Sequence, residues 1–172
     1  MNVKLAIGDP LPSVGLRATD GYLLNLRSFV TKQPAVLLFF GGPTLKGSAA
    51  APGVATVQAL ASGFQRLQQA GIGVAAISCD SEQEQTAFVA QHELPFLLLS
   101  DERRSAVEML GIATSAQRDN VNVARPILLA VDVQGDVRAV IDRIEPQYLV
   151  EQLISVLSEP IPAATEDAAA AS

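Results

Sequence analysis

Residues 35–43 read AVLLFFGGP, six apolar residues in succession followed by two glycines and a proline. A short continuous apolar run is typical of a strand that is buried on both faces of a sheet. The Gly-Gly-Pro sequence ends such a strand and opens a loop. We therefore expect a central strand over 35–40, which delivers the loop that begins at Gly41 to one end of a sheet.

Helix and strand patterns alternate on the C-terminal side of this strand. Apolar residues recur at steps of three and four from about 51 to 70, which predicts one amphipathic helix that stops at Gly71. A buried strand follows over 72–77, and Ser81 with Glu84 forms the S-x-x-E capping box of a helix that ends near Gln91. The other expected elements are strands over 94–99, 126–132 and 136–141, a helix capped by Asp101 and stopped by Gly111, a last helix from Pro146 to Leu157, and an N-terminal hairpin that joins 11–18 to 22–24.

This alternation predicts an α/β domain with parallel central strands and helices on both faces of the sheet. The antiparallel hairpin near the end of the chain makes the sheet mixed. The order of elements is that of a thioredoxin-like fold, with an N-terminal β-hairpin, over residues 1–158. Residues 159–172 consist mainly of proline, alanine and acidic residues with nothing to pack, so we expect a disordered tail there.

Composition excludes several classes of function. The chain of 172 residues is 49% apolar, which excludes bulk disorder. It carries 12 basic and 18 acidic residues, a net charge of −6, which argues against nucleic acid or an anionic membrane as partner. The apolar run at 35–40 is far shorter than the ~20 residues of a membrane helix. With no leader pattern at the N-terminus, we expect a cytoplasmic protein.

The chain has one cysteine, Cys79, and one histidine, His92. A disulfide within the chain is therefore impossible, and a zinc cage of thiolates and imidazoles, which needs about four ligands, is excluded. We expect neither a metal nor a cofactor. A catalytic Cys–His pair would require these two residues to meet in space; otherwise His92 is a cation at the end of its helix or a solvated side chain.

Five stretches in order carry a resemblance to a known family: GDPLP at 8–12, VLLFF at 36–40, ISCDS at 77–81, LPFLLLSD at 94–101 and VDVQGDVR at 131–138. Through them the chain resembles the peroxiredoxins, the thiol peroxidases of the alkyl hydroperoxide reductase and thiol-specific antioxidant type. The resemblance runs from about Ile7 to Leu157. It implies a thioredoxin fold, antioxidant oxidoreductase activity and the dimer surfaces that the family commonly uses.

The resemblance also implies a P-x-x-x-T/S-x-x-C loop directly after the strand at 36–40. In the family, the thiol of this loop attacks the peroxide O–O bond, while the hydroxyl and the loop amides hold the peroxide. The loop here reads GGPTLKGSA over 41–49 and contains no cysteine.

Three registers can be compared. A match from Phe39-Phe40 without a gap places Ala49 at the peroxidatic position. A match to relatives with a W-C-P-x-C loop places Leu45 and Ser48 at the two thiols, and alignment of Pro43 and Thr44 as the family's proline and threonine places Gly47 there. Each register lacks the thiol, and a serine cannot replace it, because cleavage of the peroxide needs a thiolate that cycles through sulfenic acid.

We therefore expect a degenerate peroxiredoxin site in a protein that acts as a binding or assembly module, with a homodimer as its possible form. The first alternative is a thiol-dependent peroxidase that uses Cys79 and a thiol donor protein. Cys79 follows a buried strand at the sheet end where ligands bind, but a small buried side chain is the simpler interpretation.

Arg125 precedes the strand at 126–132. The resemblance implies that an arginine there stabilises the thiolate and polarises the peroxide; otherwise it is paired with an acid at the rim. The resemblance also makes Pro126 a candidate cis-proline that faces the site loop, against an ordinary trans proline at a strand start.

The second alternative is a small anion or nucleotide binder at Thr44–Ser48 and Arg125. Lys46 precedes Gly47, so the phosphate-loop fingerprint G-x-x-x-x-G-K-[ST] fails. A glycine-rich loop between a strand and a helix nevertheless exposes amides that attract anions. Lys46 and Arg125 are the expected cations of such a pocket.

Overall fold

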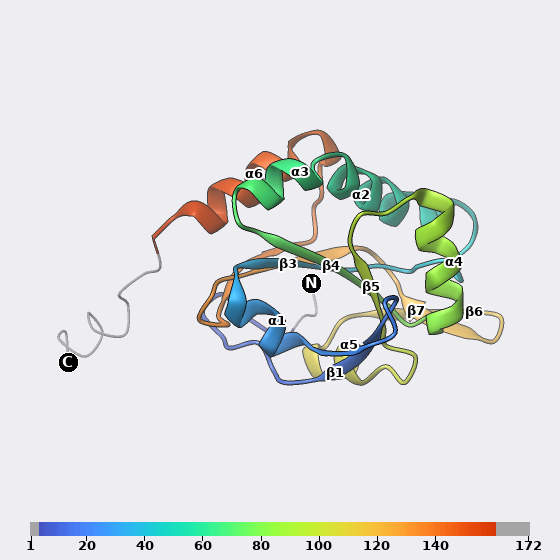
Figure 1. The fold of residues 1–172 in the computed structure, drawn as a ribbon. Coiled ribbons are helices and arrows are strands. Elements are labelled where there is room, and N and C mark those ends of the chain that lie inside the picture. The colour runs from blue at the N-terminus through green and yellow to red at the C-terminus, as the bar shows by residue number, and fades with distance from the viewer. Residues whose placement is uncertain (1–3, 161–172) are drawn as a thin grey trace.

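The computed structural model describes residues 4–160, within which a seven-stranded sheet has helices on both faces (Figure 1). The strand order is β2-β1-β5-β4-β3-β8-β9. The strands of this sheet are β1 Gly15–Ala18, β2 Leu23–Asn25, β3 Ala35–Phe39, β4 Gly73–Ser78, β5 Leu97–Ser100, β8 Ile127–Val131 and β9 Val137–Ile141. A separate hairpin pairs β6 Thr114–Gln117 with β7 Asn120–Val123.

The centre of the sheet is parallel and its edges are antiparallel. β3 is parallel to β4, and β4 is parallel to β5. β8 runs antiparallel to β3, β9 to β8, and β1 to β5. All residues of β3, β4 and β8 are buried, as the continuous apolar runs predicted. The mixed sheet and thioredoxin-like order that we expected from the sequence are confirmed.

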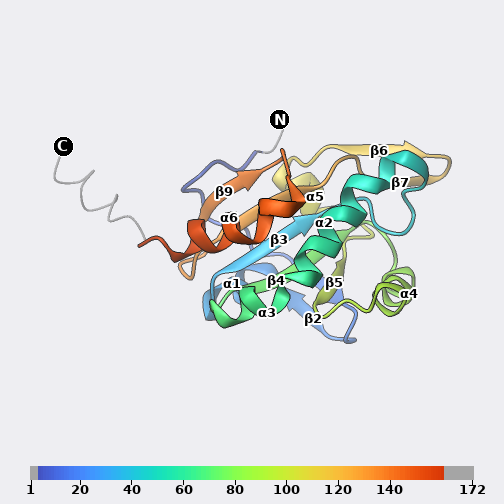
Figure 2. The same cartoon turned by 90° about the horizontal axis from the view of Figure 1, so that it is seen from above.

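Two hydrophobic cores lie on opposite faces of the sheet, and each has its own helices (Figures 1 and 2). One face is covered by α2, α3 and α6 with α4 beside them, and the other by α1 and α5. The bounds are α1 Leu26–Lys32, α2 Ala51–Ser62, α3 Phe64–Gln69, α4 Glu82–His92, α5 Ser105–Leu110 and α6 Pro146–Ser158. A short 3₁₀ turn, η1 Gly47–Ala50, precedes α2.

The helix expected over 51–70 is two helices, α2 and α3, which meet at Gly63. A Cβ at Gly63 would overlap Val150 of α6, so the glycine permits a close approach of α6 that no larger residue allows. The capping box is confirmed: Ser81 Oγ accepts from Glu84 N at 3.1 Å, and Glu84 Oε1 accepts from Ser81 N at 2.9 Å.

Asp101 was expected to cap α5, and its carboxylate does cap the helix, although Asp101 does not occupy the N-cap position. The N-cap is Arg104, whose φ of 61° is left-handed. The Asp101 carboxylate nevertheless accepts from Ala106 N at 3.1 Å and Val107 N at 2.8 Å, because the turn after β5 places it over the start of the helix. Burial raises the pKa of Asp101 above its ordinary value, although these N–H groups oppose the shift.

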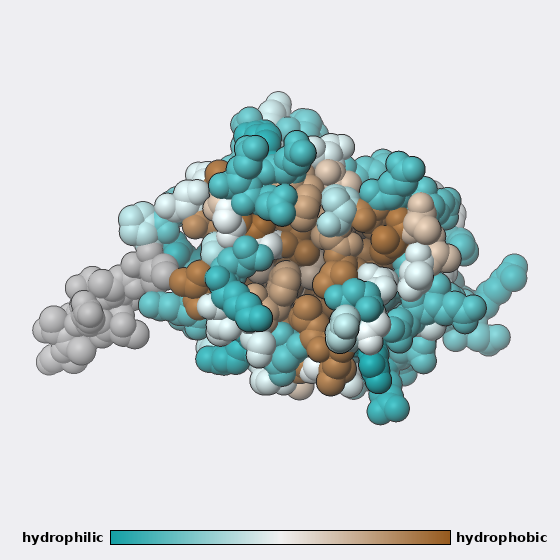
Figure 3. Space-filling view, in the orientation of Figure 1, coloured by the Kyte–Doolittle hydropathy of each residue, from teal (hydrophilic) through white to brown (hydrophobic). Residues whose placement is uncertain are grey.

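α6 ends at Ser158, where the predicted domain ends. Of the predicted tail over 159–172, only Glu159 and Pro160 fall within the described residues, and both contact Arg138; the prediction for 161–172 lies outside them. No helix between residues 4 and 160 is long and apolar enough to cross a membrane. Figure 3 shows apolar surface through the middle of one face with polar surface around it.

Candidate functional site

The loop that follows β3 lies at the carboxyl end of the parallel strands, the usual place for ligands in such sheets. Gly42 is in the left-handed region, at φ +62°, and a Cβ there would overlap the carboxylate of Asp80. Thr44 N donates to Asp80 Oδ1 at 2.9 Å. The turn is therefore closed over a buried carboxylate, and only glycine fits at position 42.

Asp80 belongs to a buried polar network beneath this loop. Ser78 Oγ donates to Asp80 Oδ2. Gln85 Nε2, from α4, donates to Ser78 Oγ at 2.9 Å and to the carbonyl of Leu99 at 2.8 Å. Gln85 Oε1 has no partner within residues 4–160. The loop is thus anchored to β4, α4 and β5 together.

The β6–β7 hairpin holds the loop from the other side. Asn122 Nδ2 donates to Thr44 Oγ1 at 2.9 Å, while Asn122 Oδ1 accepts from Cys79 N at 2.8 Å. Lys46 N donates to Gln117 Oε1 at 2.9 Å, and Gln117 Nε2 donates back to the Lys46 carbonyl at 3.2 Å. The strands of this hairpin carry no hydrophobic pattern in the sequence, so Asn122 and Gln117 were not predicted to belong to the site.

Cys79 directly follows β4 and packs into the core on the α5 side of the sheet. Only 9% of the residue is exposed. Burial raises the pKa of the Cys79 thiol to about 12, and the carboxylates of Asp101 and Asp80 act in the same direction. The reactive form of a cysteine is the thiolate, so this thiol is poorly suited to attack a peroxide near neutral pH.

His92 and Cys79 do not form a pair. Cys79 precedes the first turn of α4, whereas His92 is its last residue, roughly 15 Å further along the helix axis at a rise of 1.5 Å per residue. The His92 ring packs on Phe88 with centroids 4.3 Å apart. Within residues 4–160, no group of three or more His, Cys, Asp or Glu side chains is placed to hold a metal ion.

Arg125 is exposed and lines a pocket of about 330 Å³ together with Ala49, Pro52 and Asp142. Ala49 is the position that the gap-free register matches to the family's thiol. The Arg125–Pro126 peptide is trans, because no peptide bond between residues 4 and 160 is cis. The expectation of a cis-proline is therefore wrong: Pro126 directly precedes β8, where trans geometry is favoured and no ladder hydrogen bond is lost.

Lys46 lines a different pocket, of about 910 Å³, in which Arg125 takes no part. The expected pairing of Lys46 with Arg125 in one pocket is therefore wrong. The second cation of this pocket is Arg118, at the turn of the β6–β7 hairpin. The lining residues are Pro43, Thr44, Lys46, Gly47, Glu84, Ala87, Gln117, Arg118 and Asn120. Ser48 is exposed and lines neither pocket.

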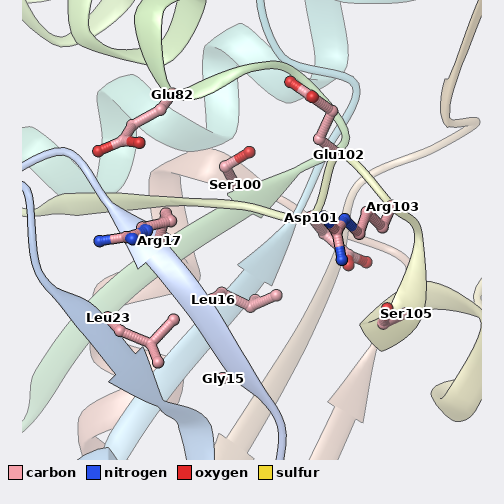
Figure 4. Close-up of a pocket in the computed structure, with 10 residues that line it drawn as sticks. All are labelled: Gly15, Leu16, Arg17, Leu23, Glu82, Ser100, Asp101, Glu102, Arg103 and Ser105. Atoms are coloured by element: carbon pink, nitrogen blue, oxygen red, sulfur yellow. The ribbon is translucent and has the colours of Figure 1, made fainter.

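A further pocket of about 380 Å³ lies beside β1 and the end of β5 (Figure 4). In this view Arg17 and Glu82 lie on one side of Leu16, and Asp101 and Arg103 on the other. Its two arginines are thus accompanied by carboxylates, so it offers no excess of positive charge to an anion. Of its charged residues, only Asp101 had a predicted role from the sequence, as a helix cap.

Residues 7–140 match the model of the AhpC/TSA family. Peroxiredoxin Bcp of Escherichia coli strain K12 is 31% identical over 142 residues, which cover 80% of this chain and 86% of that protein. A chloroplastic peroxiredoxin Q of Populus jackii is 35% identical over 111 residues; these cover 63% of this chain and only 48% of the plant protein, about half its length.

Solved structures show the same fold at low sequence identity. Peroxidoxin BcpB of Mycobacterium tuberculosis superposes with a TM-score of 0.75 at 17% identity, covering 90% of this chain and 97% of that one. A mutant of PrxQ of Xylella fastidiosa gives a TM-score of 0.71 at 17% identity, covering 88% and 94%. These likenesses establish the arrangement of helices and strands, and say nothing of activity.

Proposed function

Since the chain belongs to the AhpC/TSA family of peroxiredoxins, we propose that it retains the family's fold without the thiol that reduces peroxide. One observation carries this proposal. The loop over 41–49 has no cysteine, and Cys79, the single thiol of the chain, is buried with a pKa of about 12. A largely buried side chain that holds its proton is poorly suited to the role of a peroxidatic thiolate.

In place of peroxide reduction, the protein acts as a binding or assembly module in the cytoplasm. The hydrogen bonds that hold the site loop in place support a binding role, because Asp80, Asn122 and Gln117 all bond to it. Assembly, as a homodimer, is supported by exposed apolar side chains at the β1–β2 hairpin. Tyr22 and Leu23 are 74% and 67% exposed.

A second candidate function is the binding of a small anion beside Arg125. The observation in its favour is that Arg125 and Ala49 line one pocket. The resemblance gives this arginine the task of stabilising a thiolate. With alanine in place of the thiol, the pocket keeps a cation whose usual anion is missing. Asp142 lines the same pocket, so a ligand there is held by the hydrogen bonds of the guanidinium rather than by an excess of positive charge.

The thiol-dependent alternative, in which Cys79 and a thiol donor reduce peroxide, needs Cys79 to be a reactive thiolate. It requires Cys79 to be ionised and exposed, whereas burial and two nearby carboxylates favour the protonated form.

Peroxide consumption with dithiothreitol as reductant separates these possibilities. We expect the protein and its Cys79→Ser variant to consume peroxide at the same rate as buffer with reductant, while a control peroxiredoxin turns over. Turnover that is lost in Cys79→Ser would overturn the proposal in favour of the thiol enzyme.

Light scattering tests whether the protein assembles as a homodimer. We expect a dimer that dissociates in a Tyr22→Ser, Leu23→Ser double variant. A monomeric wild type would refute the proposed assembly.

A further inference from the structure

We propose that the pocket between the site loop and the β6–β7 hairpin binds the phosphate group of a small organic phosphate. Its volume of about 910 Å³ lies within the range of small-molecule sites. The proposal rests on the binding role argued above, but it does not involve Arg125 or a thiol. It can therefore fail while the absence of peroxidase activity stands.

The charges of the pocket favour an anion. Lys46 comes from the loop after β3, and Arg118 from the turn between β6 and β7, so two separate segments each supply a cation. Among residues 4–160 the ion pairs are Arg66–Glu151, Arg138–Asp132 and Arg138–Glu159, and none involves these two cations. With Glu84 as the carboxylate that lines the pocket, the two cations leave its lining with an excess of positive charge, on a chain whose net charge is −6.

The two segments are fixed to each other, so the site exists before a ligand arrives. The backbone of Lys46 exchanges hydrogen bonds of 2.9 and 3.2 Å with the amide of Gln117. Arg118, the next residue, has a left-handed φ of 55°, which a non-glycine residue adopts at some cost. The two hydrogen bonds between Lys46 and Gln117 hold both cation-bearing segments at the same pocket. Such preorganisation lowers the entropy that binding must overcome.

Neutral donors complete the site. Thr44 Oγ1 accepts from Asn122 Nδ2, and within residues 4–160 its own hydroxyl proton has no acceptor, so it remains able to donate. The one carboxylate of the pocket, Glu84, is engaged: its Oε1 accepts from Ser81 N in the capping box of α4. The Glu84 carboxylate disfavours a long polyanion while leaving room for a single phosphate.

These groups suit a phosphate better than a carboxylate. The guanidinium of Arg118 can donate two parallel hydrogen bonds, the ammonium of Lys46 supplies a compact charge, and Thr44 adds a hydroxyl. A phosphate has three terminal oxygens for these three donors, whereas a carboxylate has two. Pro43 and Ala87 line the same pocket and offer apolar surface to the organic part of the molecule. The chemistry therefore points to a small phosphate ester.

AMP is a suitable probe, with adenosine as the analogue that lacks the phosphate. In an NMR titration at low salt, we expect AMP to produce saturable shifts at the backbone amides of 43–47 and 117–120, and inorganic phosphate to displace it. Adenosine should leave these resonances unchanged. Lys46→Gln and Arg118→Gln should each weaken AMP binding roughly tenfold, because each removes a charge-assisted hydrogen bond.

Arg17→Gln is the matched control, since it removes an exposed arginine from a different pocket. We expect it to bind AMP as the wild type does, and Arg125→Gln tests whether AMP instead binds at the pocket that Arg125 lines. The proposal is overturned if AMP gives no saturable shift up to about 10 mM, if the Lys46→Gln, Arg118→Gln double variant binds like the wild type, or if Arg125→Gln alone abolishes binding. All four positions are exposed, and an unchanged amide spectrum elsewhere shows that each variant is folded.

Discussion

The backbone N–H of Cys79 donates a 2.8 Å hydrogen bond to Oδ1 of Asn122, which ties the segment that carries the single thiol to strand β7. The same Asn122 side chain donates to Thr44 at 2.9 Å. One buried amide therefore connects the thiol-bearing segment with the site loop. The thiol itself faces the core, so this connection stabilises the loop without bringing the sulfur to a ligand.

Removal of the Asn122 amide should destabilise the protein. Asn122→Ala leaves the Cys79 N–H and the Thr44 hydroxyl without this partner, and an unsatisfied buried group costs about 1–3 kcal/mol. We expect a loss of unfolding free energy in this range, measured by urea denaturation, and faster hydrogen exchange at the Cys79 amide. Asn120→Ala, at an exposed position of the same hairpin, should stay within about 0.5 kcal/mol of the wild type. Equal effects of the two substitutions would contradict the conclusion that the Asn122 side chain stabilises the loop through these hydrogen bonds.

A side chain at Gly42 should be far more harmful than one at Gly47. Both glycines have a positive φ, at +62° and +76°, so alanine at either position meets the same kind of backbone strain, about 1–2 kcal/mol. Only at Gly42 would the added Cβ overlap Asp80; at Gly47 it meets open space. Gly42→Ala should therefore cost about 1–3 kcal/mol more than Gly47→Ala in denaturant. Similar losses would mean that the turn does not rest on the Asp80 carboxylate.

The raised pKa of Cys79 makes stability depend on pH in the alkaline range. The pKa in the folded protein is about 12, above the ordinary value of 9.0, so the unfolded chain loses its thiol proton first. The stabilisation from this group is fully present below about pH 9 and is lost as the pH rises towards 12. We expect the unfolding free energy of the wild type, relative to Cys79→Ser, to fall over this interval. A difference independent of pH would show that the thiol is not held in its protonated form.

A thiol placed next to Arg125 should be more reactive than the natural one. In a Cys79→Ser background, Ala49→Cys introduces a cysteine into the pocket that Arg125 lines, and a neighbouring cation lowers a thiol pKa. We expect Ala49→Cys to be oxidised by peroxide at least about tenfold faster than Cys79 in the wild type, and addition of Arg125→Gln to slow it. Ser48→Cys, which lines neither pocket, is the control. If Ser48→Cys reacted faster than Ala49→Cys, the gap-free register would be wrong.

The fold was predictable because its central strands are continuous apolar runs between strong turn signals. The β6–β7 hairpin was not, since its strands are short and its residues from Thr114 to Asn120 are mostly exposed and carry no hydrophobic pattern. Arg118 was missed with it. Lys46 and Arg125 both adjoin strands of the sheet, which made them candidates for one pocket, but the hairpin supplies the cation beside Lys46 and Arg125 lines another pocket.

The central claim is that Cys79 is not a peroxidatic thiol. Intact-mass spectrometry after brief exposure to peroxide, with a sulfenic-acid trap present, tests it most directly. Wild type, Cys79→Ser and a control peroxiredoxin are treated side by side. We predict that the control acquires the trap adduct while the wild type keeps its unmodified mass. Rapid formation of an adduct on the wild type, absent from Cys79→Ser, would contradict the account and assign the chain an active thiol.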